Sequence, residues 1–324
     1  MQANPRILVT RRWPAACEKR LSEHYQVTFN AQNEPLGVDA LKAAVRDYDA
    51  VLPTVTDSLN SEVFSQDSIR CRFIGNFGVG YNHIDMASVR SRGIVVSNTP
   101  DVLTDCTADI AMLLLLMSAR RASEGEILLR AGQWSGWHPT HLLGTKVAGK
   151  TLGLVGFGRI AKAVAQRAHF GFGMKILVIG RKSIPQAELD PFHAQEADSL
   201  ESLLSHSDFV SLHCPGSAEN RHLINAERLK AMKPESILIN TARGDVIDSE
   251  ALIEALQSRQ IRAAGLDVYE GEPHLHPGFL TLDNVSLLPH LGSATEETRT
   301  GMGMRVIDNL DAFFRGETPP DKVA

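Results

Sequence analysis

The apolar residues of this chain fall into short runs that alternate with amphipathic stretches. In the first hundred residues, apolar runs typical of strands lie at residues 7–10, 26–29, 50–52, 73–74 and 94–96. Stretches with a helical pattern separate them, at residues 14–21, 38–45, 61–64 and 84–90. This alternation is typical of a small doubly wound parallel sheet.

A second alternation of strands and helices follows a long apolar helix, which we predict over residues 101–120. Its run at residues 113–116 is apolar on every face, so we expect it to be buried. Further strands are predicted at residues 152–155, 176–179, 209–212, 237–239, 263–268 and 285–288. A helix at residues 250–256 is expected to begin with Asp248 or Ser249 as its N-cap, and a final helix spans residues 296–314.

Residues 132–149 form a glycine-containing excursion before the second group of strands. Trp134 and Trp137 lie in it without an evident core of their own. Aromatic residues in such a loop suggest a contact surface, and packing onto their own domain is the alternative. The first interpretation predicts that this loop reaches a partner subunit.

Residues 151–180 have the order strand, glycine turn, helix, strand. The turn reads Gly156-x-Gly158-x-x-Ala161. In the βαβ unit that binds a dinucleotide, the first glycine permits a tight turn and the second lets the pyrophosphate approach the backbone. Ala161 replaces the more usual third glycine, which is a mild change. The predicted phosphate-binding residues are Gly156, Phe157, Gly158, Arg159 and Ile160, at a helix N-terminus that favours an anion.

The residues after the second strand of this unit bear on the choice of cofactor. An NAD site usually has Asp or Glu there to bind the ribose 2′-hydroxyl. This chain has Gly180, Arg181, Lys182 and Ser183 instead. Because Arg binds a phosphate through a bidentate fork, the sequence predicts a preference for NADP(H), with NAD(H) still possible. A solvated basic turn beside an NAD site is the alternative.

Composition excludes several classes of function. The 324 residues are 43% hydrophobic, which suffices for two domains, and the formal net charge of −5 indicates no nucleic-acid surface. The longest apolar run, residues 110–117, is too short to span a bilayer, and the opening MQANPRILVT lacks the apolar core of a signal peptide. The four cysteines are scattered, as is typical of reduced thiols. We expect a cytoplasmic protein without membrane or nucleic-acid partners.

No metal site is predicted. His138 and His141 lie close in sequence, as do His274 and His276, but neither pair has further ligands nearby.

Three polar residues follow strands of the second half of the chain: Arg243, Glu272 and His290. Ligands bind at the carboxyl ends of the strands in open parallel sheets, so these side chains can converge. The set suits reduction of a 2-keto acid, in which Arg243 binds the carboxylate and polarises the carbonyl. His290 then donates a proton to the developing alkoxide, and Glu272 favours the imidazolium form. Taken singly, each residue is better explained by an ordinary loop or surface position, and only their common placement favours a catalytic role.

Five segments together resemble the D-2-hydroxyacid dehydrogenase family over nearly the whole chain. They read VGYNHID, LVGFGRIA, NTARGDVID, GLDVYEGEP and LLPHLGSAT. The segments VTRRWP and GQWSGWHP and the turn at Gly180 resemble most the glyoxylate/hydroxypyruvate reductases of that family. The resemblance implies an α/β fold of two doubly wound parallel-sheet (Rossmann-like) domains with a cleft between them. The expected substrate-binding, flavodoxin-like domain comprises residues 1–99 plus 291–324, and the dinucleotide-binding domain residues 100–290.

The resemblance also implies roles for individual residues. Arg243, Glu272 and His290 are implied as the catalytic set. Val79 and Gly80 are implied to offer backbone N–H groups to the substrate carboxylate, and we expect the loop that contains Val55 to line the same pocket. Further cofactor contacts are implied or expected for Thr107, His213, Cys214, Pro215, Thr241, Ala242, Asp267 and Gly292. Family members are usually dimers, so a homodimer is expected.

The sequence thus predicts an enzyme that reduces a small 2-keto acid, glyoxylate or hydroxypyruvate, to the D-2-hydroxy acid by hydride transfer from NADPH. One alternative is a reductase of a bulkier 2-keto acid. Another, of a different class, is a dinucleotide-sensing interaction protein like the co-repressors that resemble these enzymes. Such proteins tend to carry disordered extensions, and little sequence follows Phe314, which favours the enzyme.

Overall fold

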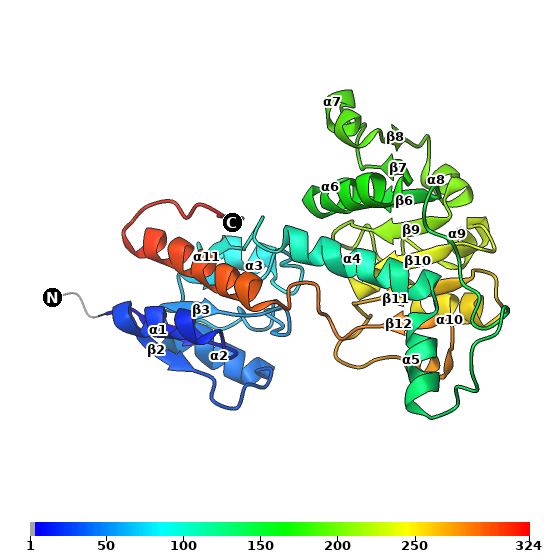
Figure 1. The fold of residues 1–324 in the computed structure, drawn as a ribbon. Coiled ribbons are helices and arrows are strands. Elements are labelled where there is room, and N and C mark those ends of the chain that lie inside the picture. The colour runs from blue at the N-terminus through cyan, green and yellow to red at the C-terminus, as the bar shows by residue number, and fades with distance from the viewer. Residues whose placement is uncertain (1–3) are drawn as a thin grey trace. The chain divides into compact units, whose positions relative to one another are not determined.

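The computed structural model describes residues 4–324 and divides into two compact units (Figure 1). The first unit contains the residues up to Leu103 together with Ser293–Ala324, and the second is Thr104–Gly292. The sequence-based boundaries were residues 99 and 290. Each unit is an α/β structure built on its own parallel sheet.

The first unit contains a five-stranded sheet with the strand order β2-β1-β3-β4-β5, and all its neighbouring strands are parallel. The strands are β1 (Arg6–Val9), β2 (Gln26–Phe29), β3 (Ala50–Leu52), β4 (Phe73–Gly75) and β5 (Val95–Ser97). The helices are α1 (Ala15–His24), α2 (Val38–Asp47), α3 (Met86–Ser91) and α11 (Glu296–Phe314).

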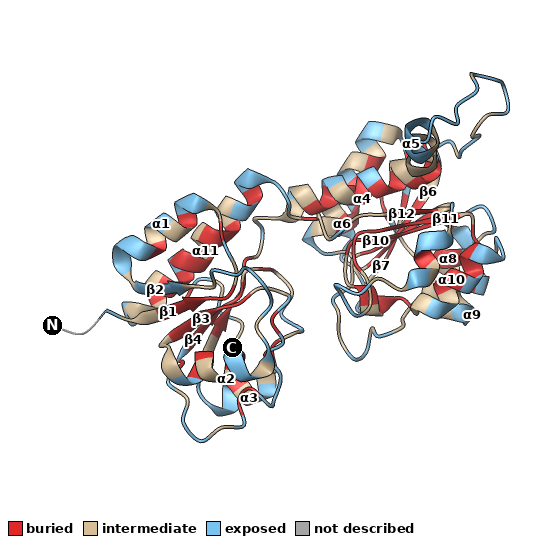
Figure 2. Ribbon diagram, turned by 90° about the horizontal axis from the view of Figure 1, so that it is seen from below, coloured by how far each residue is buried: buried red, intermediate tan, exposed pale blue. Residues whose placement is uncertain are grey.

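Alternating strand residues of the first unit face two helical layers. Ile7 and Val9 of β1 pack in a core with α1 and α11, whereas Leu8 belongs to a core with α2 and α3. This follows from the two-residue period of side chains along a strand. Figure 2 shows the buried residues concentrated on the sheet and on the helix faces that cover it. Helix α11 therefore belongs to the first unit.

The second unit contains a seven-stranded parallel sheet with the order β12-β11-β10-β9-β6-β7-β8. The strands are β6 (Thr151–Val155), β7 (Lys175–Ile179), β8 (Gln195–Glu196), β9 (Phe209–Leu212), β10 (Ile237–Asn240), β11 (Ala263–Leu266) and β12 (Val285–Leu287). The helices are α4 (Thr104–Ala119), α5 (Ala122–Arg130), α6 (Arg159–Gln166), α7 (Gln186–Leu189), α8 (Leu200–His206), α9 (Ala226–Ala231) and α10 (Ser249–Gln257). Asp248 caps α10 by accepting a hydrogen bond from the N–H of Ala251.

The prediction that residues 113–116 are entirely buried is wrong for Leu113, whose exposed fraction is 42%. Leu114 and Leu115 are buried, and Leu116 is partly buried. Helix α4 packs against α6, β10 and β11, so its 3.6-residue period leaves one side uncovered within this chain.

The helix predicted at residues 61–64 is also wrong, because the structure has a hydrogen-bonded turn there. The N–H of Phe64 donates to the carbonyl of Ser61, and the N–H of Ser65 donates to Glu62. A run of four residues forms too few hydrogen bonds to offset the cost of helix nucleation. Strand β8, of two residues, was not predicted.

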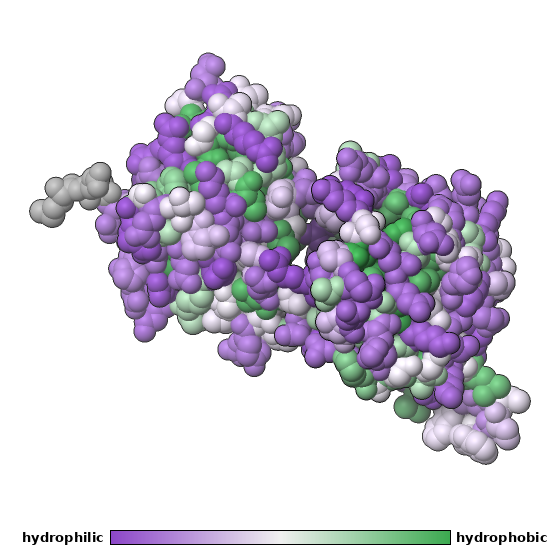
Figure 3. All heavy atoms as spheres, turned by 90° about the horizontal axis from the view of Figure 1, so that it is seen from above, coloured by the Kyte–Doolittle hydropathy of each residue, from purple (hydrophilic) through white to green (hydrophobic). Residues whose placement is uncertain are grey.

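The excursion at residues 132–149 carries exposed apolar side chains. Trp134 is 53% exposed and Trp137 is 81% exposed. Helix α5 contributes Ile127 and Leu129, both exposed, and has no buried residue. The surface seen in Figure 3 is mainly hydrophilic and is interrupted by smaller hydrophobic areas.

No helix in the described range, residues 4–324, is long and apolar enough to cross a membrane. The same residues contain no group of three or more side chains suited to hold a metal ion.

Candidate active site

Three adjacent strands of the second unit, β10, β11 and β12, end in loops that carry the predicted catalytic residues. Arg243 follows β10, Glu272 follows β11 and His290 follows β12. Because the strands are parallel, their carboxyl ends lie at the same edge of the sheet. The structure thus brings the three loops together within one unit.

The loop that carries Arg243 is shaped by Asn240, the last residue of β10. The Asn240 Nδ2 donates to the Arg243 carbonyl at 2.8 Å, and Oδ1 accepts from the N–H of Ala242 at 3.0 Å. Burial lowers the pKa of the Arg243 guanidinium, and the nearby carboxylates of Glu272 and Asp245 oppose that shift. Arg243 remains a cation at neutral pH, since free guanidinium loses its proton only in strong base.

Gly244 allows the loops after β10 and β11 to pack directly on one another. A Cβ atom at this position would lie 1.8 Å from the backbone carbon of Tyr269. The Tyr269 hydroxyl donates to the carbonyls of Leu266 and Leu288, at 3.1 and 2.7 Å, and so links the ends of β11 and β12. These contacts fix the spacing of the three loops.

Glu272 and His290 form a hydrogen-bonded pair. The His290 Nδ1 donates to Glu272 Oε2 at 2.7 Å, and the N–H of Tyr269 donates to Oε1 at 2.8 Å. Burial alone would raise the pKa of Glu272, but the hydrogen bond and the positive charge of His290 lower it below its ordinary 4.5. Both side chains remain about one-third exposed, at 34% for His290 and 29% for Glu272, so a substrate has access to the imidazole.

Asp267 holds the loop on which His290 lies. Its carbonyl accepts from the N–H of His290, and its carboxylate accepts from the N–H groups of Leu291 and Gly292 at 2.6 and 2.8 Å. Burial raises the pKa of Asp267, and these N–H groups and the charge of His290 act in the opposite direction. The family resemblance implied contact between Asp267 and the nicotinamide, and in the structure this carboxylate also anchors the catalytic loop.

The turn between β6 and α6 requires glycine at its first position. Gly156 has a φ of +89°, and a Cβ there would lie 2.9 Å from the His213 backbone. A Cβ on Gly158 would instead meet open space. No side chain among residues 4–324 caps the N-terminus of α6, which begins at Arg159. Free N–H groups and an open approach are what a pyrophosphate needs.

The other predicted cofactor residues surround the same edge of the sheet. The backbone N–H of His213 donates to the carbonyl of Val155. Burial lowers the pKa of the His213 ring to about 4 and raises the pKa of the Cys214 thiol to about 11. Thr107 donates its hydroxyl to the carbonyl of Gly292 at 3.1 Å. The buried Oγ1 of Thr241 has no hydrogen-bond partner within the part of the chain that the structure describes, so a ligand or water can supply one. Phe157 and Ile160 pack against the core of this unit. The N–H of Ala242 donates to the side chain of Asn240, and the carbonyl of Pro215 accepts from the side chain of Asn220.

Arg181 and Lys182 lie exposed on the turn after β7. Within residues 4–324, neither side chain forms an ion pair or a hydrogen bond. Two unpaired cations follow Gly180, which stands where the family's NAD sites carry an acidic residue. Ser183 differs, since its hydroxyl donates to Glu196 at 3.2 Å.

The first unit contains the backbone loop implied to bind the substrate carboxylate. Asn76 Nδ2 donates to the carbonyls of Gly78 and Gly80 at 2.9 and 3.0 Å, and Asn98 Nδ2 donates to Val79 at 2.9 Å. These bonds engage the carbonyls of the loop. The N–H groups of Val79 and Gly80 donate no hydrogen bond to any residue of the described range.

Val55 lies beside this loop, because a Cβ on Gly78 would be 3.3 Å from its Cγ1. The structure therefore gathers all three predicted substrate-binding residues of the first unit, namely Val55, Val79 and Gly80.

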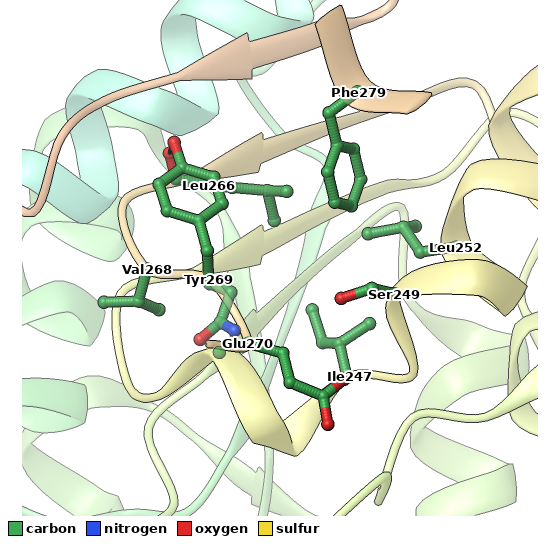
Figure 4. Close-up of a pocket in the computed structure, with 10 residues that line it drawn as sticks. Ile247, Ser249, Leu252, Leu266, Val268, Tyr269, Glu270 and Phe279 are labelled. Atoms are coloured by element: carbon green, nitrogen blue, oxygen red, sulfur yellow. Dashed lines mark hydrogen bonds between the residues drawn. The ribbon is translucent and has the colours of Figure 1, made fainter. Parts of the chain in front are cut away.

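A small cavity lies behind the catalytic loops of the second unit (Figure 4). Ile247, Leu252 and Phe279 line it with apolar side chains, and Ser249, Tyr269 and Glu270 also border it.

Several residues that shape the site were not predicted from the sequence. Asn76, Asn240 and Tyr269 act through hydrogen bonds to loop backbones. Asn at the end of a predicted strand is a recognisable signal, because its side chain readily bonds nearby backbone groups. The contacts of Tyr269 join separate strands and left no local signal.

A parallel α/β unit with a glycine turn at a free helix N-terminus, beside an Arg, Glu and His cluster, defines a dinucleotide-dependent oxidoreductase. Comparison with known proteins narrows this class. A model of the family described as "D-isomer specific 2-hydroxyacid dehydrogenase, NAD binding domain" matches residues 112–292.

Similar proteins align over almost the full chain. The glyoxylate reductase of Thermococcus kodakarensis is 46% identical over 98% of this chain and 96% of its own. The glycerate dehydrogenase of Hyphomicrobium methylovorum is 39% identical over 96% of each chain. The crystal structure of an NADPH-dependent glyoxylate/hydroxypyruvate reductase from Sinorhizobium meliloti, in complex with NADP and malonate, has a TM-score of 0.87 at 35% identity and covers 99% of this chain and 97% of that one.

The chain belongs to the D-isomer specific 2-hydroxyacid dehydrogenase family and is an oxidoreductase. This family implies a nicotinamide dinucleotide as cofactor. The open backbone at Gly158, the uncapped N-terminus of α6 and the unpaired Oγ1 of Thr241 fit such a molecule.

Proposed function

We propose that this enzyme reduces a small 2-keto acid, glyoxylate or hydroxypyruvate, to the D-2-hydroxy acid with NADPH. The glyoxylate reductase and glycerate dehydrogenase relatives support this substrate class. The observation that carries the proposal is the pair of His290 and Glu272 on loops packed against the loop of Arg243. A proton donor and a carboxylate-binding cation are the two groups that reduction of a keto acid requires.

Arg243 binds the substrate carboxylate and polarises the keto oxygen in this proposal. Its guanidinium is a permanent cation whose fork of N–H groups matches a carboxylate. Partial burial strengthens its electrostatic effect on a developing alkoxide relative to the same charge in water. The hydrogen bonds of Asn240 keep the Arg243 backbone in place during that step.

His290 acts as the general acid. Its Nδ1 is engaged by Glu272, which leaves Nε2 to hold the proton for the substrate oxygen. The low pKa of Glu272 keeps that carboxylate ionised at neutral pH, so it stabilises the imidazolium before the proton is transferred.

The N–H groups of Val79 and Gly80 provide a second means of binding an anion. They are unbonded, while the carbonyls of their loop are engaged by Asn76 and Asn98. Adjacent free N–H groups form a concavity suited to a carboxylate. We propose that they bind the substrate carboxylate and that Val55 limits the substituent on its keto carbon.

A bound nicotinamide dinucleotide supplies the hydride. The residues proposed to hold it are those of the Gly156–Ile160 turn, together with Thr107, Asp267, Gly292 and the loops at residues 213–215 and 241–242. Arg181 and Lys182 are proposed to bind the 2′-phosphate of NADP(H), since they are exposed cations without a partner among residues 4–324.

We also propose that the enzyme is a homodimer. Ile127 and Leu129 of α5 and Trp134 and Trp137 of the excursion that follows it are all exposed. Exposed apolar side chains that lie close in sequence often mark an interaction surface, and a twofold interface buries such a surface.

A panel of 2-keto acids tests the proposed reaction. Glyoxylate, hydroxypyruvate, pyruvate and phenylpyruvate are each assayed with NADPH and with NADH, and kcat/KM is compared. The highest values are expected for glyoxylate or hydroxypyruvate with NADPH, and chiral chromatography should identify D-glycerate from hydroxypyruvate. A preference for phenylpyruvate would instead support the enzyme of bulkier substrates, and failure to reduce any of the four would refute the proposal.

A further inference from the structure

The turn that carries Arg181 and Lys182 is held by a carboxylate from the neighbouring strand. Glu196 lies on β8, which pairs with β7 in parallel. Both of its carboxylate oxygens accept from the N–H of Ile184 at 3.1 Å, and Oε2 also accepts from the Ser183 hydroxyl at 3.2 Å. One side chain thus binds both residues that follow the two cations.

The turn is also tight at its first residue. A Cβ on Gly180 would lie 2.8 Å from the carbonyl oxygen of Lys182 and 3.2 Å from Cγ1 of Ile184. An acidic residue cannot replace Gly180 without displacing the backbone of Lys182. The absence of the acid typical of NAD sites is therefore part of the conformation of this turn.

This conformation leaves the two cations available. Lys182 and Arg181 lie between Gly180 and the residues bound by Glu196, and both are exposed and unpaired within residues 4–324. Within residues 4–324 the carboxylate of Glu196 forms no ion pair with either cation, and its bonds go to the N–H of Ile184 and the hydroxyl of Ser183. A fixed backbone lowers the entropy lost when flexible side chains grip a phosphate.

We infer that Glu196 is a positioning residue for cofactor selectivity, which fixes the turn so that Arg181 and Lys182 face the 2′-phosphate of NADP(H). The inference rests on the NADPH preference proposed above. It assigns Glu196 no contact with the cofactor. A different role, in which Glu196 itself binds the ribose hydroxyls of NAD, would be expected to favour NADH.

The test measures binding without turnover. Dissociation constants of NADPH and NADH are determined by fluorescence titration, and those of 2′,5′-ADP and 5′-ADP by calorimetry, for the wild type, Glu196→Ala and Glu196→Gln. Glu196→Ala should weaken the binding of NADPH and of 2′,5′-ADP about tenfold, which is the loss of affinity expected when hydrogen bonds to a charged group are removed. The dissociation constants of NADH and 5′-ADP should stay within about twofold of the wild type. Glu196→Gln should stay close to the wild type, because its amide oxygen still accepts from Ile184.

Two further variants control the result. Glu188→Ala removes a nearby negative charge that pairs with Lys162 and should not alter the NADPH to NADH ratio. Gly180→Ala displaces the Lys182 backbone without changing any charge. It should selectively weaken the binding of NADPH, and it provides this result even if Glu196→Ala folds poorly.

Each outcome separates the inference from the function on which it rests. A wild type that binds NADPH no more tightly than NADH would refute the proposed cofactor preference. A wild type that prefers NADPH, with Glu196→Ala and Gly180→Ala both leaving the ratio unchanged, would overturn the role of Glu196 alone. Selectively weaker binding of NADH by Glu196→Ala would also overturn the proposed role of Glu196, because Glu196 would then be the ribose ligand.

Discussion

At the scale of single residues, glycines decide how closely the catalytic loops approach. Gly244 is the clearest case, since the backbone of Tyr269 occupies the space of a Cβ. The loops of Arg243 and Glu272 are packed together only because this side chain is absent. The spacing of the active site therefore depends on a residue that takes no part in the chemistry.

Gly244→Ala should move these loops apart and destabilise the protein by about 1–3 kcal/mol, the usual cost of overpacking. Reduction should fall sharply as well, because Arg243 and Glu272 shift together. Gly171→Ala in the same unit is a matched control, as a Cβ there meets nothing within 4 Å. Thermal unfolding and kcat/KM check both variants, and equal behaviour of the two would contradict the packing argument.

Arg243 and His290 should fail in different ways when each is replaced. Arg243→Ala should raise KM and lower kcat, because the cation serves substrate binding and carbonyl polarisation together. His290→Ala should lower kcat on the order of a hundredfold or more, a common value for general acid catalysis. Arg243→Lys keeps the positive charge but loses the two-pronged guanidinium, so its KM should lie between those of the wild type and Arg243→Ala. Steady-state kinetics separates these cases, and an unchanged kcat in His290→Ala would exclude it as the acid.

At the scale of elements, the sequence pattern predicted most strands and helices because each buries a regular apolar face. Residues 26–29, 50–52 and 209–212 form strands with the predicted bounds. Strand β8 was not predicted because two residues are too few to show the alternation of a strand. The exposure of Leu113 was not predicted because a helix that is apolar on every side does not reveal which side is covered. Arg243, Glu272 and His290 could be proposed as catalytic from the sequence because they follow strands. Glu196 and Tyr269 act through tertiary contacts that a sequence pattern does not contain.

The turn between β1 and α1 contains an ion pair whose contribution to stability depends on pH. Arg12 donates two hydrogen bonds to Glu18 at 2.7 Å, and the N–H of Trp13 donates a third. The hydrogen bond from Arg12 lowers the pKa of Glu18 below its ordinary 4.5, with burial opposing. The pair therefore stabilises the fold above pH 4.5 and is lost as pH falls through the lowered pKa.

Glu18→Gln should lower Tm at pH 7 and have little effect in acid, where the wild-type carboxyl is protonated too. Glu23→Gln on the same helix is the control, because its contact with Lys19 is long, at 4.0 Å, and exposed. Differential scanning calorimetry across pH checks the pair. An equal loss of Tm at pH 7 and in acid would show that the charge of Glu18 is not responsible.

At the scale of the whole molecule, the exposed excursion after α5 predicts self-association. The wild type should be a dimer at micromolar concentration, and Trp134→Ser combined with Trp137→Ser should shift it towards monomer by removing apolar interface. Leu280→Ser, also on an exposed residue of the second unit, should leave the dimer intact. Light scattering distinguishes the two, and a monomeric wild type would remove this proposal.

The central claim is that His290, paired with Glu272, protonates the substrate oxygen. Reduction should fade as pH rises and the imidazolium is lost, while the low pKa of Glu272 keeps the pair intact well into the acid range. Replacing Glu272 by Gln removes the negative charge beside the imidazole, so the alkaline limb of the rate profile should move to lower pH. Glu270→Gln, in the same loop but bound to Arg221, is the control and should not move it.

The most direct test is the pH profile of kcat/KM for glyoxylate reduction with NADPH, measured for the wild type and Glu272→Gln. The account predicts an alkaline limb at lower pH in the variant, with Glu270→Gln following the wild type. Coinciding limbs for the wild type and Glu272→Gln would contradict the role of the His290–Glu272 pair.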